Sequence, residues 1–75
     1  MISNRTIDRL GTLFDELINK RLTDVGDIEC ASELLDAVTN VVYSVGGSEA
    51  ATRLWRVATN LDVTDVRPLI EEEKE

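Results

Sequence analysis

Residues 27–45 read DIECASELLDAVTNVVYSV, and the apolar residues in this stretch recur at steps of three and four. This period places them on one side of an α-helix, whereas a half-buried strand would need strict alternation. The apolar positions are Ile28, Cys30, Ala31, Leu34, Leu35, Ala37, Val38, Val41, Val42 and Val45. Because they cover roughly half of the helix circumference, we expect a central helix that packs against at least two others.

A helix is also expected before this stretch, over residues 3–22. Ser3 and Asn4 are both good N-cap residues, since their side chains can accept a hydrogen bond from a free backbone N–H of the first turn. The apolar positions again follow a helical period, and they are Ile7, Leu10, Leu13, Phe14, Leu17, Ile18 and Leu22. A glycine inside a helix costs about 1 kcal/mol relative to alanine, so Gly11 predicts a close crossing with another helix.

Further signals mark where the helices begin and end. Residues 23–26 interrupt the apolar period, so Asp27 is expected to cap the central helix. The glycine pair at 46–47 is expected to end that helix, and Ser48 is expected to cap a third one. The third helix carries its apolar residues on one side, at Ala51, Leu54, Trp55, Val57, Ala58 and Leu61. Asn60 is a candidate left-handed terminator.

A short final helix is expected after Thr64, with Pro68 in its first turn, where the missing N–H does little harm. Residues 70–75 read IEEEKE and are expected to form a frayed acidic tail. The elements together predict an all-α fold, a compact bundle of three main helices plus a short C-terminal helix, with the helix over 27–45 central. A chain of 75 residues is too short to divide, so residues 1–75 are expected to form a single helical domain.

The small size of the chain limits its stability. A domain of this length buries only about 60% of its unfolded surface. Cys30 is the only cysteine and there is no histidine, so neither a disulfide nor a structural zinc site can supplement the core. Association is the remaining common route, and we expect a homodimer or a subunit of an assembly.

The sequence gives little indication of catalysis. Without histidine, the usual general acid–base group at neutral pH is missing. Cys30 falls on the inward half of the central helix and is interpreted as a buried structural thiol, not as a nucleophile. Phosphate-loop and calcium-loop motifs are absent from the sequence. We therefore expect no enzyme activity, no cofactor and no metal.

The charge balance restricts the class of partner. Fifteen Asp and Glu face eight Lys and Arg, which gives a net charge of −7. Such a field repels phosphate backbones and anionic lipids and attracts basic surfaces, so direct nucleic-acid binding is disfavoured. No stretch approaches the roughly 18 apolar residues of a membrane span. A single unpaired cysteine fits a reducing compartment, and a cytoplasmic protein is expected.

Acidic and amide side chains recur at steps of four, three and four on the outer side of the helix over 27–45, and no lysine or arginine interrupts this helix. Tyr43 lies at the margin of this strip, where it could anchor an interface or cover the end of a neighbouring helix. Asp8 and Asp15 have similar spacing on the helix over 3–22. The predicted partner-binding residues are Asp8, Asp15, Glu29, Glu33, Asp36, Asn40 and Tyr43. The alternative interpretation is a solvated face of an acidic protein.

These observations lead to a first hypothesis, a non-enzymatic regulator or inhibitor whose acidic face engages a protein partner with a basic surface. In size and charge the chain resembles phage-encoded inhibitors that block basic nucleic-acid-binding surfaces, anti-CRISPR proteins among them, and this likeness implies an origin in a phage or mobile element. The alternative is a small structural subunit or homodimeric adaptor that uses the wide apolar side of the helix over 27–45.

A third hypothesis is DNA binding. Residues 57–67, VATNLDVTDVR, resemble the local pattern of helix-turn-helix proteins, in which a turn separates two helices and the second one enters the major groove. Asp62 stands where that family usually has glycine. The residues that follow are mainly acidic, so Arg67 is the only candidate for a DNA contact.

Overall fold

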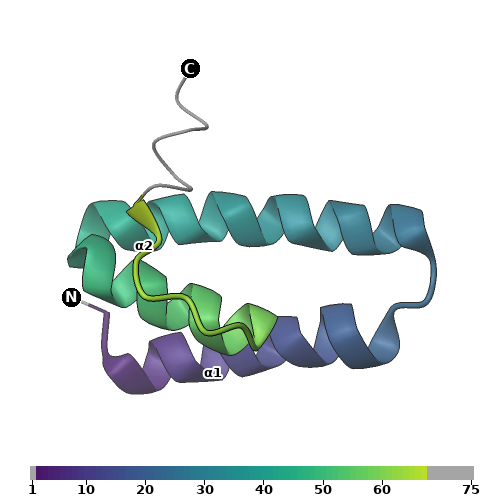
Figure 1. Ribbon diagram of the computed structural model, residues 1–75, viewed down its shortest axis with the longest axis horizontal. Coiled ribbons are helices and arrows are strands. Elements are labelled where there is room, and N and C mark those ends of the chain that lie inside the picture. The colour runs from purple at the N-terminus through teal and green to yellow at the C-terminus, as the bar shows by residue number, and fades with distance from the viewer. Residues whose placement is uncertain (1, 68–75) are drawn as a thin grey trace.

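The computed structural model describes residues 2–67 of the chain. Three helical elements follow one another, α1 (Asn4–Asp15), η1 (Glu16–Arg21) and α2 (Val25–Thr59), and this described part of the chain has no β-strand. α1 and the first part of α2 run side by side in opposite directions, and the second part of α2 packs on one side of the pair (Figure 1). The predicted all-α fold is confirmed.

α1 begins where the sequence predicts. Ser3 is the N-cap, with extended backbone angles, and its hydroxyl oxygen accepts a hydrogen bond of 3.2 Å from the backbone N–H of Thr6. α1 continues without a break into η1, a π-helix. The N–H of Leu22 donates to the carbonyl of Leu17, five residues back, at 2.9 Å. The helix predicted over residues 3–22 therefore has the expected extent, but its last part is wound more widely than an α-helix.

α2 begins earlier than expected. Asp24 is the N-cap, and its carboxylate accepts a hydrogen bond of 3.2 Å from the backbone N–H of Asp27. The prediction that Asp27 caps this helix is wrong, because Val25 and Gly26 belong to the first turn and are not part of a linker. A cap at Asp24 satisfies a free N–H of that turn, which offsets the low helix propensity of the glycine.

α2 reverses its direction at Gly47. This residue has φ 83° and ψ −177°, and two helical segments meet there without an intervening loop. We call residues 25–46 the outgoing segment and residues 48–59 the return segment; Figure 1 shows the chain turning back between them. The reversal falls at the predicted glycine pair. The expected arrangement of three main helices plus a short fourth is nevertheless not matched, since the second and third predicted helices form one element.

The chain after α2 is not helical as far as residue 66. Asn60 adopts the left-handed conformation predicted for it, with φ 56° and ψ 28°. Residues 61–66, here called the strap, run back over the return segment (Figure 1). The N–H of Val66 donates to the Thr52 hydroxyl at 3.0 Å, and the guanidinium of Arg56 donates two hydrogen bonds, of 3.1 and 2.8 Å, to the Val63 carbonyl. Most of the predicted C-terminal helix, and the acidic tail over 70–75, lie outside the described residues.

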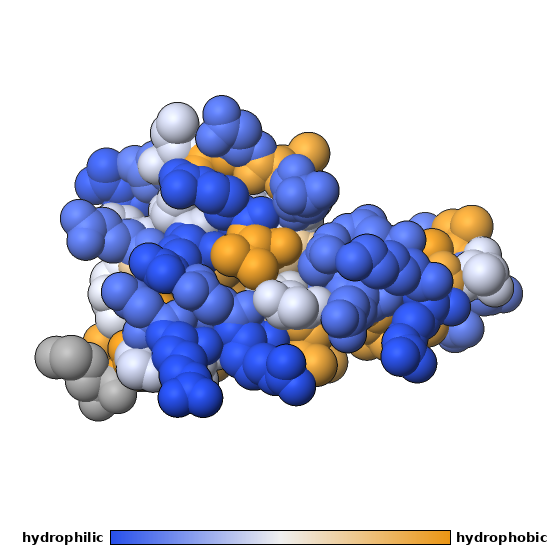
Figure 2. All heavy atoms as spheres, turned by 90° about the horizontal axis from the view of Figure 1, so that it is seen from below, coloured by the Kyte–Doolittle hydropathy of each residue, from blue (hydrophilic) through white to orange (hydrophobic). Residues whose placement is uncertain are grey.

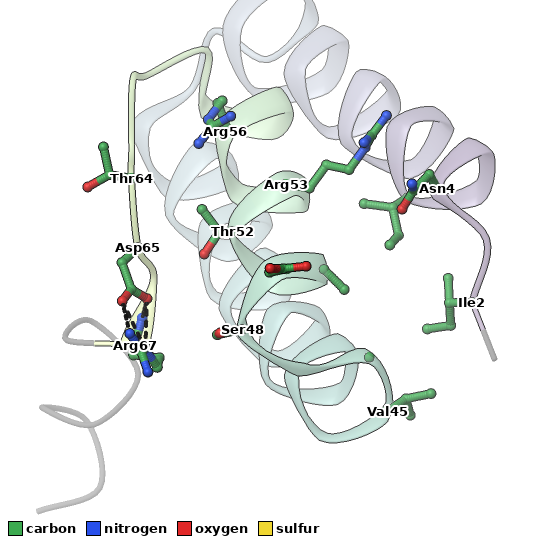
Figure 3. Close-up of a pocket in the computed structure, with 14 residues that line it drawn as sticks. Ile2, Asn4, Val45, Ser48, Thr52, Arg53, Arg56, Thr64, Asp65 and Arg67 are labelled. Carbon is green, nitrogen blue, oxygen red and sulfur yellow. Dashed lines mark hydrogen bonds and ion pairs between the residues drawn. The ribbon is translucent and has the colours of Figure 1, made fainter.

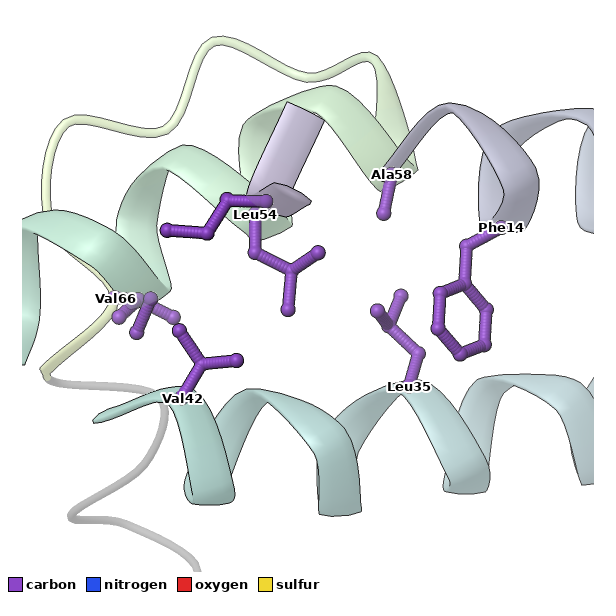
Figure 4. Close-up of a cluster of buried hydrophobic side chains, with 8 residues drawn as sticks. Phe14, Leu35, Val42, Leu54, Ala58 and Val66 are labelled. Atoms are coloured by element: carbon purple, nitrogen blue, oxygen red, sulfur yellow. The ribbon is translucent and has the colours of Figure 1, made fainter. Parts of the chain in front are cut away.

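The hydrophobic core lies between α1, both segments of α2 and the end of the strap (Figure 4). The residues of this cluster are Ile7, Phe14, Leu35, Val42, Ala51, Leu54, Ala58 and Val66. Gly11 of α1 faces Val57 of the return segment, and a Cβ atom at Gly11 would lie 2.7 Å from the Val57 Cβ. The close crossing predicted from this glycine is confirmed.

Candidate functional site

The outer side of the outgoing segment carries the predicted strip of acidic and amide side chains. We call Glu29, Glu33, Asp36 and Asn40 the acidic strip. Glu29 and Glu33 are exposed, whereas Asp36 and Asn40 are half-buried. The side-chain amide of Asn40 donates a hydrogen bond of 3.0 Å to the backbone carbonyl of Asp36. The helical period brings these four residues together on one face, as the sequence predicts.

Asp8 and Asp15 do not join the acidic strip. The carboxylate of Asp8 binds Arg53 of the return segment through two hydrogen bonds of 2.7 Å, a bidentate ion pair. These hydrogen bonds hold the pKa of Asp8 below its ordinary value of 3.8. Asp15 accepts a hydrogen bond of 2.7 Å from the Asn19 side chain and lies 3.8 Å from the Lys20 ammonium. Both predicted partner-binding carboxylates thus have partners within the chain.

Tyr43 and Cys30 lie on different sides of the outgoing segment. Tyr43 is half-buried and packs against the hydrophobic core, as does Trp55 of the return segment. Cys30 is exposed, so its interpretation as a buried thiol is wrong. The apolar arc of the outgoing segment is wider than its neighbours can cover, and Cys30 falls on the uncovered part.

Several large apolar side chains of α1, η1 and the outgoing segment are exposed. On the outgoing segment, Leu34, Val41 and Val45 are 56%, 60% and 57% exposed, and on α1 and η1 Leu13 and Leu17 are 48% and 37% exposed. We call these five residues the apolar face. Half-buried Leu10 and Val38, which pack against the core, lie one helical turn from members of the face. The sequence had assigned all five residues to packing sides of helices, and the width of the apolar arc was the signal that some would stay uncovered.

Leu13 and Leu17 of the apolar face lie on the side of α1 and η1 that points away from the return segment. Asp8 marks the edge of α1 next to the return segment, because it binds Arg53. Leu13 and Leu17 project from the opposite edge of the same helix. The helical period groups Leu34, Val41 and Val45 on one side of the outgoing segment, and Val45, at its end, also lines a depression beside the turn at Gly47. Seen from below, the outer surface of α1 is mainly hydrophilic, with hydrophobic atoms in separate patches (Figure 2).

A shallow depression of about 680 Å³ lies beside the turn at Gly47, between the N-terminal residues, the return segment and the strap (Figure 3). Arg53, Arg56 and Arg67 all line it. Arg53 binds Asp8, Arg56 binds the Val63 carbonyl, and Arg67 pairs with the carboxylate of Asp65 at 2.6 Å. The side-chain and backbone hydrogen bonds from Arg67 lower the pKa of Asp65. The positive charge at the depression is therefore engaged by groups of the chain itself.

The helix-turn-helix interpretation requires a second helix after the turn, and the described residues do not contain one. Residues 61–66 form the strap, and of the residues after it only Arg67 is described. Arg67, the single candidate for a DNA contact, is ion-paired with Asp65.

Over residues 2–67, no three Asp, Glu, Cys or His side chains lie close enough together to hold a metal ion. Within the same range, the helices are too short or too polar to cross a membrane. The chain matches no protein-family model, no curated protein and no solved structure. The acidic strip and the apolar face are therefore the features from which a function can be argued.

Proposed function

We propose that this protein is a non-enzymatic regulator that binds a protein partner through the acidic strip of the outgoing segment, and that the partner presents a basic surface. The observation that carries the proposal is the position of the strip. It is an uninterrupted row of acidic and amide side chains on a segment without lysine or arginine, next to exposed apolar side chains. Like charges in one row slightly destabilise a helix, and a basic partner would relieve this repulsion.

Two other carboxylates of the chain are bound by arginines of the same chain, and this difference supports the strip as the binding surface. Asp8 and Asp65 are each engaged by an arginine of the same chain. Glu29 and Glu33 are exposed on a segment that has no cation of its own. A partner with clustered lysine or arginine side chains can therefore approach these two carboxylates without displacing an internal ion pair.

A regulatory role, and not catalysis, fits the chemistry of the described residues. Exposed carboxylates on a helix do not have the enclosed, low-dielectric surroundings that separate the pKa values of a catalytic pair. The depression in Figure 3 is open and its arginines are engaged within the chain. Inhibition of a basic nucleic-acid-binding protein, as in phage-encoded inhibitors of similar size and charge, is one form that such regulation can take.

The proposal is tested by affinity capture from nuclease-treated lysate of the native host, eluted with a salt gradient. Wild-type protein should retain a partner in stoichiometric amount and release it at moderate salt, because the contact is electrostatic. Charge reversal at Glu29, Glu33 and Asp36 to lysine should abolish capture while the helical circular dichroism spectrum is kept. The matched control reverses three acidic residues elsewhere, Glu16, Glu49 and Asp62, and should still capture the partner. Equal capture by both triple variants would contradict the proposal.

A further inference from the structure

We infer that the apolar face is the interface of a two-fold homodimer, in which α1 and η1 of one copy pack on the outgoing segment of the other. The acidic strip flanks this face, and the use of the face in self-association goes beyond the proposed function. Its first basis is exposure. Five large apolar side chains on α1, η1 and the neighbouring outgoing segment are each between 37% and 60% exposed, in a chain of only 75 residues. Large exposed apolar side chains gathered on neighbouring helices of a small domain mark an interaction site.

The second basis is the charge on the two flanks of the face. This charge indicates that a second copy of the chain binds there. Along α1 and η1, Arg9, Leu13, Leu17 and Arg21 follow one another at steps of four, so an exposed arginine lies at each end of the two leucines. Along the outgoing segment, the acidic strip lies on the far side of Cys30 and Ala37 from the face. Arginines therefore flank the two leucines, with the single carboxylate Glu16 between them, whereas the other flank is acidic, and a second copy of this chain supplies the complement to both.

The charges also select the orientation of the dimer. A two-fold axis parallel to the helices places the arginine flank of each copy on the acidic flank of the other, and the helices in contact run antiparallel. A two-fold axis across the helices would instead bring the two acidic strips together, which electrostatic repulsion disfavours. In the parallel-axis dimer, Arg9 and Arg21 approach the edge of the strip nearest the face. The outermost part of each strip stays on the surface, available for a different partner.

Sedimentation velocity of the full chain over a concentration series tests the interface. The wild-type protein should pass from monomer to dimer as its concentration rises. The double variant Leu34→Ser/Val41→Ser should raise the dissociation constant by at least about tenfold, since it removes two exposed apolar contacts from each copy. The control is Leu61→Ser, because Leu61 is 60% exposed but lies on the strap side of the molecule. Dimerisation should be unchanged in this control.

A charge exchange tests the orientation. The variants Arg9→Glu/Arg21→Glu and Glu29→Arg/Glu33→Arg should each dimerise at least about tenfold more weakly than wild type, because like charges then meet at both flanks. An equimolar mixture should form a heterodimer, in which every flank again faces its opposite. Dimers of Arg9→Glu/Arg21→Glu as stable as those of wild type would overturn the proposed orientation.

A wild-type chain that stays monomeric at every concentration overturns the homodimer. If removal of residues 68–75 then produced a dimer, the occupant of the face would be the chain's own C-terminal residues. The Leu34→Ser/Val41→Ser variant keeps the acidic strip intact. Its capture of the lysate partner therefore reports on the proposed function whether or not the dimer exists.

Discussion

At Gly11, the absence of a side chain allows α1 to approach the return segment. The nearest atoms to an added Cβ would be the Cβ and Cγ1 of Val57, both at 2.7 Å, and the backbone nitrogen of Ala58 at 3.3 Å. Contacts to a β-branched side chain and to backbone cannot be relieved by a simple rotation. The glycine therefore sets the distance between the two helices, although alanine would be the better helix former.

Replacement of Gly11 by alanine should lower the free energy of unfolding by about 1–3 kcal/mol, because the overpacking outweighs the gain in helix propensity. Urea denaturation followed by circular dichroism measures the change. Gly26→Ala is the control, since its added Cβ meets no backbone and no β-branched side chain, only the capping Oδ1 atom of the exposed Asp24, at 3.1 Å. That variant should differ from wild type by less than about 1 kcal/mol. A stabilising effect of Gly11→Ala would contradict the tight crossing.

The ion pair of Asp8 with Arg53 makes stability depend on pH in a defined direction. Because the pKa of Asp8 in the folded state is below 3.8, its contribution is complete above that value and is lost as the pH falls through the lowered folded-state pKa. Asp8→Asn should therefore be less stable than wild type at pH 7, and the difference should shrink below pH 3.8. Thermal melts between pH 2 and pH 7 measure this. A difference that grows on acidification would contradict the assignment.

At the scale of the elements, Gly47 converts two helical segments into a hairpin. Its backbone angles, φ 83° and ψ −177°, belong to a region that L-residues rarely occupy, and no atom lies within 4 Å of an added Cβ. The backbone conformation alone, not lack of space, thus requires glycine. The return segment then buries Ala51, Leu54 and Ala58 against α1 and the outgoing segment.

Gly47→Ala should cost about 1–3 kcal/mol of the free energy of unfolding, because an L-residue is strained at this position. A chain of this length is accessible to chemical synthesis, so D-alanine at position 47 provides a matched control with the same added methyl group. D-Alanine favours these angles and should be at least as stable as glycine. If both alanines destabilised the protein equally in guanidinium denaturation, strain would not be the cause.

The strap depends on one buried hydrogen bond. Val66 is fully buried, and its N–H is satisfied by the hydroxyl of Thr52. Thr52→Val keeps the shape of the side chain but leaves this N–H unpaired, which should cost about 1–3 kcal/mol. Thr52→Ser keeps the hydroxyl and should lose no more than about 1 kcal/mol. Urea denaturation compares the two, and equal losses would show that the hydrogen bond contributes nothing.

Local rules predicted much of the fold, because they depend only on neighbouring residues. The left-handed end at Asn60 and the close crossing at Gly11 follow from such rules and are confirmed, and of the two predicted caps, Ser3 and Asn4, Ser3 is the one used. Such local rules do not predict which residues from distant parts of the chain contact each other. The partner of Asp8 lies 45 residues away in the chain, and the exposure of Cys30 depends on which part of a wide apolar arc the neighbouring segments cover.

At the scale of the whole molecule, two different surfaces lie next to each other on the outgoing segment. The acidic strip could be predicted from the spacing of its residues, since every member lies on one helix. The apolar face could not be delimited in that way, because its members come from two helices and are defined by what the return segment does not cover. Asp8 and Asp15 had the spacing of binding residues, but internal partners engage them.

The most direct test of the central claim is a nuclear magnetic resonance titration of the isotopically labelled chain with the partner that affinity capture recovers. If the acidic strip is the binding surface, the largest backbone amide shifts should cluster at Glu29, Glu33, Asp36 and Asn40. These shifts should reverse when salt is added. Shifts that cluster instead around the depression at Arg53, Arg56 and Arg67, with the strip unchanged, would contradict the claim and place the binding surface at that depression.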